Sequence, residues 1–367
     1  MKQNKIFIAL SIVVMLPFYA SAQAPKYSNE FLAIGVGARG LGMSGAQSAI
    51  VDDATSAYWN PAGLCHVKSN LQLYLMHSVY FADIAKYDYA SVVAPIDEKR
   101  VVGLSMVRFA VDNIPNTLDL IDKDGTIDYN KLKTFSAADY AFLFSYAQKT
   151  KITGLTLGGN VKVVHRIVGD FAKAWGFGLD AGAQYEHNRW RFAAVGKDIT
   201  STFNAWTYNT SSLEEVFAQT GNAIPQNGLE ITLPRLILGT AYKFDVTKKV
   251  SVQPALDADL TFDGYRNVPI KSKVVSIDPK MGVEFGYDNF IFLRAGVCNF
   301  QKVKNIDNST STTFQPNMGL GIRLRNLTID YALTNFGNSS QSLSSNVFSL
   351  RLNIYRQHKL PAAATTK

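Results

Sequence analysis

The sequence predicts an all-β fold, a transmembrane antiparallel β-barrel of about 14 strands preceded by an N-terminal plug segment. Three observations lead to this prediction. Apolar and polar side chains alternate over long segments, the number of these segments is even, and the links between them are alternately short and long. Bacterial outer-membrane barrels have all three features, because their strands run back and forth between short periplasmic turns and longer outer loops.

The alternation has a period of two, as expected for strands with one face towards lipid and one towards a polar interior. In residues 153–165, four aliphatic side chains share one face, namely Leu155, Leu157, Val161 and Val163. The opposite face carries Gly154, Thr156, Gly158, Asn160 and Lys162. Residues 174–187 and 250–262 repeat the pattern. The second repeat has acids at alternate positions, which is unlike a core strand of a soluble sandwich.

Fourteen segments of this kind follow residue 67. They lie near residues 69–80, 84–95, 101–112, 136–147, 153–166, 174–187, 190–198, 234–244, 250–263, 274–287, 290–298, 315–324, 327–336 and 346–355. Two-residue links such as 188–189 alternate with long links such as 113–135 and 199–233. Both ends of the barrel are then expected on the periplasmic side, which places the protein in the outer membrane as a multi-pass barrel.

The alternative to a membrane barrel is a soluble lipocalin-like barrel. That class usually has about eight strands and turns its apolar face inwards, so it is the less favoured interpretation. Residues 290–297 do not fit the membrane-barrel pattern, because the register that turns Phe290 and Phe292 towards lipid also turns Arg294 there. We therefore expect a bulge or a change of facing in this segment.

Residues 1–22 are predicted to be a secretory signal peptide cleaved before Gln23. Two lysines precede an apolar run over residues 6–16, and the small residues Ala20-Ser21-Ala22 follow it. The run is shorter than the roughly 18 residues of a spanning helix. The predicted division of the chain is residues 1–22 signal peptide, 23–67 plug segment, 68–356 barrel and 357–367 periplasmic tail.

The charge of the mature chain indicates no nucleic-acid partner. Removal of the signal lysines lowers the 37 basic residues to 35 against 29 acidic residues, so the net charge is near +6. These charges are scattered without a basic run. The two cysteines, Cys65 and Cys298, are far apart in sequence; a disulfide is possible after export, and two free thiols are the favoured interpretation.

Motifs that suggest a cofactor, a metal or catalysis do not withstand comparison with the chemistry they require. Gly35, Gly37 and Gly40 form G-x-G-x-x-G, but too little chain precedes them in an exported protein for a nucleotide-binding βαβ unit. Residues 119–128 resemble an EF-hand but lack two key ligands. The histidines have no metal-ligand spacing, and Ser44 is not in a G-x-S-x-G elbow. We predict no cofactor, no metal site and no enzyme.

Residues 23–67 are rich in Gly, Ala and Ser, which suits a chain packed closely within a narrow lumen. The stretch FLAIGVGARGLGMSGAQSAIVDDATSAYWNPAGL resembles the N-terminal plug of FadL-type outer-membrane transporters, and among them the PorV/PorQ-like proteins of type IX secretion. The plug motif that carries the resemblance includes Arg39, Asp53, Asn60, Pro61, Ala62 and Gly63. The resemblance implies fourteen strands, an N-terminal hatch and a gating role for residues 60–62; a wall contact that holds the plug is an equally good interpretation.

Two functions follow from this resemblance. The first, which the arginine and methionine of the plug motif favour, is an accessory or shuttle barrel of type IX protein secretion, which binds translocon or exported proteins through its outer loops. The second is a FadL-like channel for hydrophobic small molecules, which could also occupy the lumen. Link 199–233 is predicted to be an outer loop that contacts a partner through its aromatic side chains, which include Phe203, Trp206, Tyr208 and Phe217.

Overall fold

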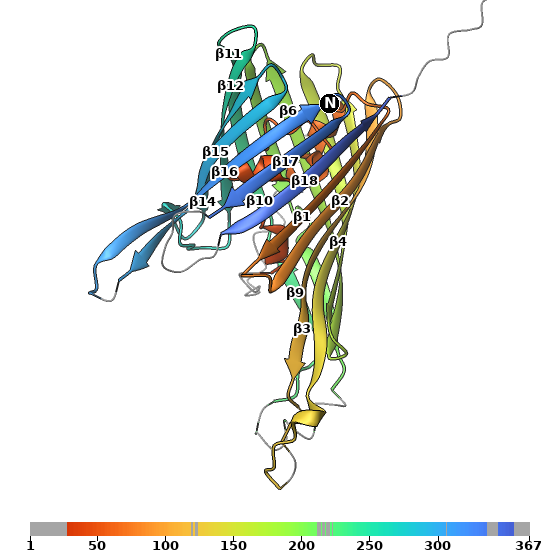
Figure 1. The fold of residues 1–367 in the computed structure, drawn as a ribbon, viewed down its shortest axis with the longest axis vertical. Helices are drawn as coiled ribbons and strands as arrows, with labels where there is room; N and C mark the ends of the chain where they lie inside the picture. Colours follow the sequence, from red (N-terminus) through yellow and green to blue (C-terminus); the bar gives the residue numbers. More distant parts are fainter. Residues whose placement is uncertain are drawn as a thin grey trace, which may run out of the picture.

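The computed structural model describes residues 28–355 except 119, 122–123, 211–213, 215–216, 218–220, 222, 306 and 336–343. The predicted signal peptide (1–22) and periplasmic tail (357–367) lie outside the described residues. Within this part of the chain, the strands form one closed antiparallel sheet (Figure 1). Closure is direct, because the first strand pairs with the last from Leu71↔Ile354 to Val79↔Asn346.

The wall has fourteen strands in the described residues, as the sequence predicted. These fourteen are made of eighteen strand elements in the described residues, some of which share one position in the wall. The elements are β1 Leu71–Tyr80, β2 Ala85–Pro95, β3 Arg100–Asn116, β4 Lys133–Lys149, β5 Leu155–Val168, β6 Ala172–His187, β7 Trp190–Lys197, β8 Thr202–Tyr208, β9 Gly228–Thr232, β10 Arg235–Tyr242, β11 Phe244–Asp245, β12 Val250–Thr261, β13 Ile270–Lys271, β14 Ser276–Tyr287, β15 Ile291–Lys304, β16 Thr310–Leu324, β17 Leu327–Thr334 and β18 Ser345–Ile354. β7 and β8 together occupy one position in the wall, since both pair with β6. β9, β10 and β11 occupy the next position, and β13 adds only a short pairing beside β14.

The two faces of the wall differ as predicted. On β5, Leu157 and Val161 are 47% and 41% exposed on the outside, whereas Asn160 and Lys162 are buried on the inside. The same division holds along β12, where Leu256 faces outwards and Asp257 inwards. An apolar outer face with a polar inner face is the arrangement that a barrel in lipid requires.

The prediction for residues 290–297 is wrong in its facing. Phe292 and Arg294 both point inwards, and Ile291 and Leu293 point outwards, so the alternation is regular and needs no bulge there. Phe292 is stable inside because the guanidinium of Arg323 lies 4.8 Å from its ring centroid. The register shift of β15 occurs further along, between Cys298 and Gln301.

Residues 199–233 are not simply an outer loop. β8 and β9 continue the wall beyond β7 and β10, and they pair from Thr202↔Thr232 to Trp206↔Gly228. Phe203, Trp206 and Tyr208 therefore lie on a strand instead of a free loop. The reason is the alternation in T-F-N-A-W-T-Y, which turns Phe203 outwards and buries Asn204 inside.

Two hairpins extend past the barrel at the end that carries the long links (Figure 1). β3 and β4 have 17 residues each, whereas about 9–11 residues cross a bilayer. β15 and β16 are also longer than a crossing requires. Each hairpin has a register shift where it leaves the wall, at Val111/Ile114 in β3 and at Cys298/Gln301 in β15. Such bulges let a strand bend away from its sheet.

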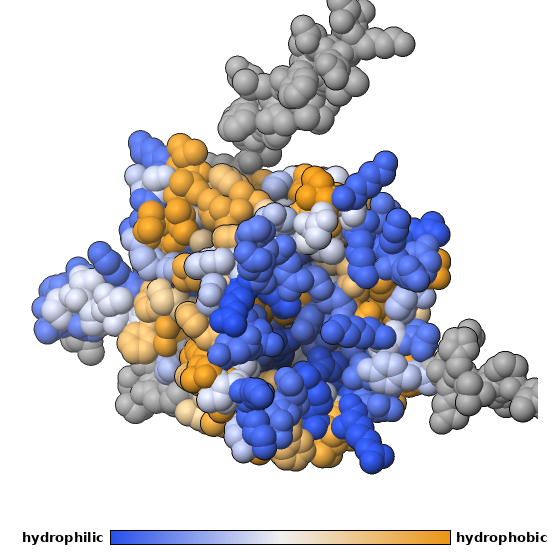
Figure 2. Space-filling model, turned by 90° about the horizontal axis from the view of Figure 1, so that it is seen from above, coloured by the Kyte–Doolittle hydropathy of each residue, from blue (hydrophilic) through white to orange (hydrophobic). Residues whose placement is uncertain are grey.

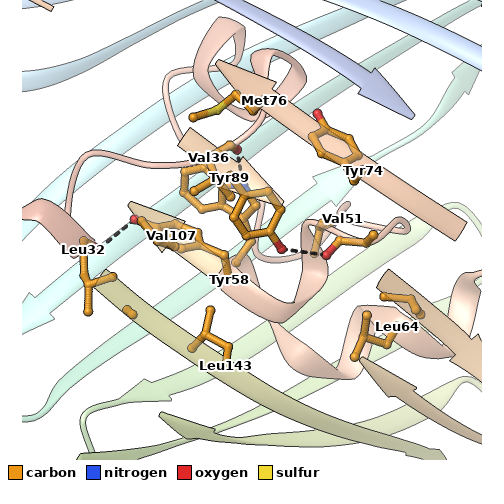
Figure 3. Close-up of a cluster of buried hydrophobic side chains, with 14 of the residues drawn as sticks. Leu32, Val36, Val51, Tyr58, Leu64, Tyr74, Met76, Tyr89, Val107 and Leu143 are labelled. Atoms are coloured by element: carbon orange, nitrogen blue, oxygen red, sulfur yellow. Dashed lines mark hydrogen bonds between the residues drawn. The ribbon is translucent and has the colours of Figure 1, made fainter. Parts of the chain in front are cut away.

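The inner segment, residues 28–67, lies inside the barrel. It consists of short helices, which are η2 Glu30–Leu32, α2 Ala38–Gly42, α3 Ser56–Trp59 and η3 Pro61–His66. A further single turn, η4 Tyr129–Lys131, lies in the β3–β4 link. In the described residues, no helix is long and apolar enough to cross a membrane. Apolar side chains of the inner segment gather with wall residues in one buried cluster, in which Leu32 and Tyr58 lie near Tyr89 and Val107 (Figure 3).

The facing of β16 gives a direct test of this fold. Leu320→Arg puts a charge on the outer face, and it should reduce the folded fraction because a charge near the bilayer midplane costs about 2–4 kcal/mol. Gln315→Arg, on the inner face of the same strand, should leave the folded fraction near wild type. The heat-dependent shift in gel mobility of the reconstituted barrel measures both. Equal losses for the two variants would contradict the assigned facing.

Candidate functional site

The inner segment touches opposite sides of the barrel. α2 lies against β15–β18, while η3 lies against β3–β6. Glycines of the wall make these contacts possible: a Cβ on Gly282 would come 2.5 Å from the carbonyl oxygen of Met43, and a Cβ on Gly158 would collide with the backbone of Pro61 and Ala62. The segment therefore fits the lumen closely, because the wall has glycine at the positions that the backbone of the segment passes.

The glycines of the opening motif serve turns and close packing. Gly37 precedes α2 with φ of 80°, a value that favours glycine. Gly40 lies against the indole of Trp59, where a Cβ would come 2.9 Å from ring atoms. The indole N–H donates a hydrogen bond to the Val36 carbonyl at 2.9 Å. These contacts account for the motif without a phosphate.

Arg39 lies in a network of ion pairs that joins the inner segment to the wall. Its guanidinium lies 2.7 Å from the Asp52 carboxylate and 2.9 Å from that of Glu284 on β14. Glu284 also pairs with Arg294, which pairs in turn with Asp330, each at 2.7 Å. Burial raises the pKa of the Asp52 carboxyl, but the positive charge of Arg39 outweighs burial and holds that pKa well below its usual range. The network spans β14, β15 and β17.

Asp53 makes a second tie to the wall. Its Oδ2 lies 3.0 Å from the guanidinium of Arg351 on β18, and its Oδ1 accepts hydrogen bonds from the backbone N–H and hydroxyl of Thr55. Removing one partner of such a buried pair leaves an uncompensated charge, which typically destabilises by about 3–5 kcal/mol. Arg39 and Asp53 of the predicted plug motif thus both act as anchors.

The other predicted motif residues lie on the opposite side of the lumen. Asn60 ends α3 and caps η3, since its Oδ1 accepts from the Ala62 N–H at 3.1 Å. Its Nδ2 donates to the carbonyls of Ser48 and, on β6, Ala183. Pro61 is the first residue of η3, Ala62 is fully buried, and Gly63 lies against Val51. This geometry is that of a wall contact.

A cavity of about 660 Å³ lies between the inner segment and the end of the barrel with the long links. This outer cavity has a floor formed by inner-segment residues that include Asn29, Leu41 and Trp59. Its wall comes from the outer ends of β10, β12 and β14–β18. Charged groups line it, among them Arg235, Asp259, Asp278 and Lys280, together with several amide side chains.

Sequence reasoning missed this cavity, although one signal was present. The two acids at alternate positions of residues 250–262, Asp257 and Asp259, lie on the polar face of that segment, and both are buried in the lumen. Asp257 accepts hydrogen bonds from the backbone N–H groups of Gln47 and Ser48, so it holds the inner segment. Asp259 lines the outer cavity. The pattern alone could not separate the two roles.

The interior is polar at the opposite end as well. Seen from the end that carries the short turns, hydrophilic side chains surround a central hollow, while hydrophobic side chains gather around the outside (Figure 2). Within the described residues, no group of three or more His, Cys, Asp or Glu side chains could hold a metal ion.

The predicted partner-contact residues are only partly brought together. The Trp206 indole N–H donates to Glu230 of β9 at 2.7 Å, and the guanidinium of Arg166 lies 5.0 Å from the Trp206 ring centroid. The Tyr208 ring stacks on that of Trp206, with centroids 6.1 Å apart. Phe203 faces outwards and Phe217, half-buried, lies further along the link. A continuous exposed aromatic surface is therefore not formed by these four residues.

Both cysteines are free thiols. Cys65 is buried in η3, where burial raises the pKa of its thiol to about 11. Cys298 is half-buried on β15 and lines the outer cavity. The structure thus agrees with two unpaired thiols, one in the inner segment and one on the wall.

Comparison with known proteins supports the fold. No protein-family model and no curated protein matches the chain. Among solved structures, the chain is similar to the CymD monoaromatic hydrocarbon channel, with a TM-score of 0.56 and 14% identity over 89% of this chain and 99% of that one. It is also similar to the toluene transporters TodX of P. putida (TM-score 0.54) and TbuX of Ralstonia pickettii (0.52), each with 14% identity over 88% of this chain and 99% of that one. A Pseudomonas aeruginosa FadL homologue matches at 0.50, with 13% identity over 86% and 97%. At these identities the likeness establishes a FadL-type barrel fold.

The contact between η3 and β5 can be tested with neighbouring glycines. Gly158→Val should displace the inner segment and lower the melting temperature, because overpacking typically costs about 1–3 kcal/mol. Gly159→Val is the matched control, since Gly159 points away from the lumen and its Cβ would meet only the Asp180 carbonyl at 3.3 Å. Thermal unfolding and protease sensitivity of the inner segment measure the effect. Similar behaviour of both variants would argue against the packed contact.

Alkylation should distinguish the two thiols. At pH 8, iodoacetamide should label Cys298 faster than Cys65, because Cys65 is buried whereas Cys298 is half-buried and lines the outer cavity. The variants Cys65→Ser and Cys298→Ser identify each rate, and denaturation without reductant should release both thiols. Failure of either thiol to react after denaturation would indicate a disulfide and contradict this assignment.

Proposed function

We propose that this protein is an outer-membrane barrel that admits small molecules through its outer cavity, in the manner of a FadL-type channel. The observation that carries the proposal is the 660 Å³ cavity, open towards the long links and floored by the inner segment. Small-molecule sites commonly have volumes of about 300–1,000 Å³. The exposed aliphatic face supports residence in a bilayer, and the likeness to three hydrocarbon channels or transporters supports transport as the purpose of the lumen.

In this proposal the inner segment acts as the plug. Its buried ion pairs to β14 and β18 fix it to one side of the lumen, and the Asn60 contact fixes it to the other. A solute that passes the barrel must then move around an anchored segment, because releasing that segment would expose several buried charges. The gating role first suggested for residues 60–62 is replaced here by anchoring. The proposal includes no catalytic step and no cofactor.

The nature of the solute does not follow from the neighbours. Those neighbours are channels or transporters for monoaromatic hydrocarbons and toluene, whereas the outer cavity of this chain is lined by charged and amide side chains as well as by apolar ones. Transfer of a hydrocarbon into such a lining would desolvate polar groups without new partners. We therefore carry over the channel and not its hydrocarbon ligand.

An accessory role in type IX secretion is the second candidate. Two observations favour it: the G-A-R-x-x-x-M-x-G run over residues 37–45, which resembles the PorV/PorQ-like plug, and the hairpins β3–β4 and β15–β16, which project past the barrel. Ile127 and Tyr129 near the tip of the first hairpin are exposed. Exposed apolar side chains on a projecting element are suited to contact with protein partners.

Shortening the β8–β9 link separates the candidates. Replacement of residues 210–226 by a short Gly-Ser linker leaves the pairing of Thr202–Trp206 with Gly228–Thr232 intact. For a small-molecule channel, this variant should change solute uptake into liposomes while the proteins that co-purify from outer membranes stay the same. For a secretion accessory that binds its partners through this link, as the sequence predicts, partner proteins should be lost while uptake stays the same. Replacement of residues 151–152 in the β4–β5 link by Gly-Ser, at the opposite end of the barrel, is the control for the introduction of a linker.

A further inference from the structure

Two opposite charges in the outer cavity form no ion pair within the described residues. The Arg235 guanidinium makes one long hydrogen bond, from Nη2 to the Leu32 carbonyl at 3.4 Å, and its Nε has no partner. The Asp278 carboxylate forms no hydrogen bond and no ion pair in this part of the chain, and its Oδ1 is buried. Both side chains line the outer cavity. Buried or half-buried charged groups ordinarily have partners, so the Arg235 and Asp278 side chains are candidates for binding a ligand.

The other charges of the cavity are compensated. Lys280 pairs with Asp259 at 2.7 Å, and Arg266 pairs with Asp263 at 2.6 Å. Asp198 is paired with Lys162 on β5. Glu30, the remaining acid of the cavity, lies on the exposed surface of the inner segment, where water screens its charge. What remains without a direct ion pair is one cation, Arg235, and one anion, Asp278. The opposite charges that lie nearby are already paired: Asp259 and Asp198 near Arg235, and Lys280 and Arg266 near Asp278.

The sheet places these two groups close together. Arg235 on β10 is opposite Thr261 on β12, which is opposite Ser276 on β14, and Asp278 is two residues further along that strand. With strands about 4.8 Å apart and residues about 3.3 Å apart along a strand, their Cα atoms are separated by roughly 12 Å. A long arginine side chain shortens the gap between the charges to the dimensions of a small molecule.

We propose that the outer cavity binds a zwitterionic small molecule, an amino acid or a short peptide, with its carboxylate on Arg235 and its ammonium group on Asp278. The inference rests on the proposed small-molecule function and names its ligand class. A guanidinium presents two parallel N–H donors that match a carboxylate, and a carboxylate accepts the three N–H donors of an ammonium group. Nearby amides of Asn299, Gln315 and Asn317 are suited to hydrogen bonding with a peptide group.

Other ligand classes satisfy the cavity less well. A hydrocarbon or an uncharged sugar would displace water from both charged groups, and it would offer neither group an opposite charge to pair with. A simple anion would satisfy Arg235 but would leave Asp278 uncompensated beside it. Only a molecule with both charges pairs both groups at once.

The test uses alanyl-alanine as the probe, with three comparison ligands: N-acetyl-alanyl-alanine, alanyl-alanine amide and maltose. Binding to the purified full-length barrel in detergent is followed by calorimetry and by Trp fluorescence, because Trp59 lines the cavity. The free dipeptide should bind, and either blocked form should bind at least about tenfold more weakly, as expected for loss of one charged hydrogen-bonding partner. Equal affinity of free and blocked dipeptides would overturn the proposal, as would preference for maltose.

The variants assign each end of the ligand. Arg235→Gln should remove the preference for the free carboxylate over the amide, and Asp278→Asn should remove the preference for the free amine over the acetylated one. Glu30→Gln, a change to another acid of the same cavity, should leave both preferences as in wild type. Arg235→Lys, which keeps the charge but not the fork, should retain part of the carboxylate preference. A Glu30→Gln effect equal to that of Asp278→Asn would overturn the assignment.

Two controls separate the possible failures. Heat-dependent gel mobility establishes that each variant is folded, and liposome uptake of toluene and of the dipeptide is measured in parallel with binding. Uptake of toluene without binding of the dipeptide would refute the zwitterion inference and leave the channel in place. Binding of the dipeptide with no uptake of either solute would refute the channel and retain the site.

Discussion

Closure of the sheet is the constraint on which the rest of the structure depends. A barrel wall must pair its first strand with its last, as β1 pairs with β18, because an open edge would leave backbone groups unsatisfied in lipid. Closure with fourteen strands creates an interior that a single layer of wall side chains does not fill. The inner segment fills much of that interior, and its polar backbone finds partners in wall side chains such as Asp257 and Gln184. The glycines and charges that point inwards follow from this arrangement.

The sequence predicted the wall well because alternation is a local signal. Each strand has its own apolar and polar faces, so the count of fourteen and the short turns could be read without knowing which strands pair. The errors have a common cause. Phe292 carries an apolar side chain on the inner face, where Arg323 lies over its ring, and β8, a strand of seven residues, lies within the predicted loop. Both depend on neighbours that are distant in sequence.

The candidate site was less predictable for the same reason. The plug motif identified the segment that contains Arg39 and Asp53, but their partners Glu284 and Arg351 lie 245 and 298 residues away. No spacing in a single sequence connects such pairs. The outer cavity is harder still, since it is made by the ends of seven or more strands and by the inner segment together. The local sequence pattern shows the sign of each charged side chain and the face of the strand on which it lies. Which charged side chains lack a partner is known only from the closed barrel.

The anchoring of the inner segment also constrains the order in which the protein assembles. The segment precedes β1 in the chain, yet Asp53 holds Arg351 on β18, the strand that closes the barrel. Its other contacts, at β5 and β6, involve strands from the first half of the wall. The Asp53–Arg351 ion pair therefore cannot form before β18 has been added to the wall. The final strand therefore has two roles. It closes the cylinder by pairing with β1, and it holds the inner segment through Arg351.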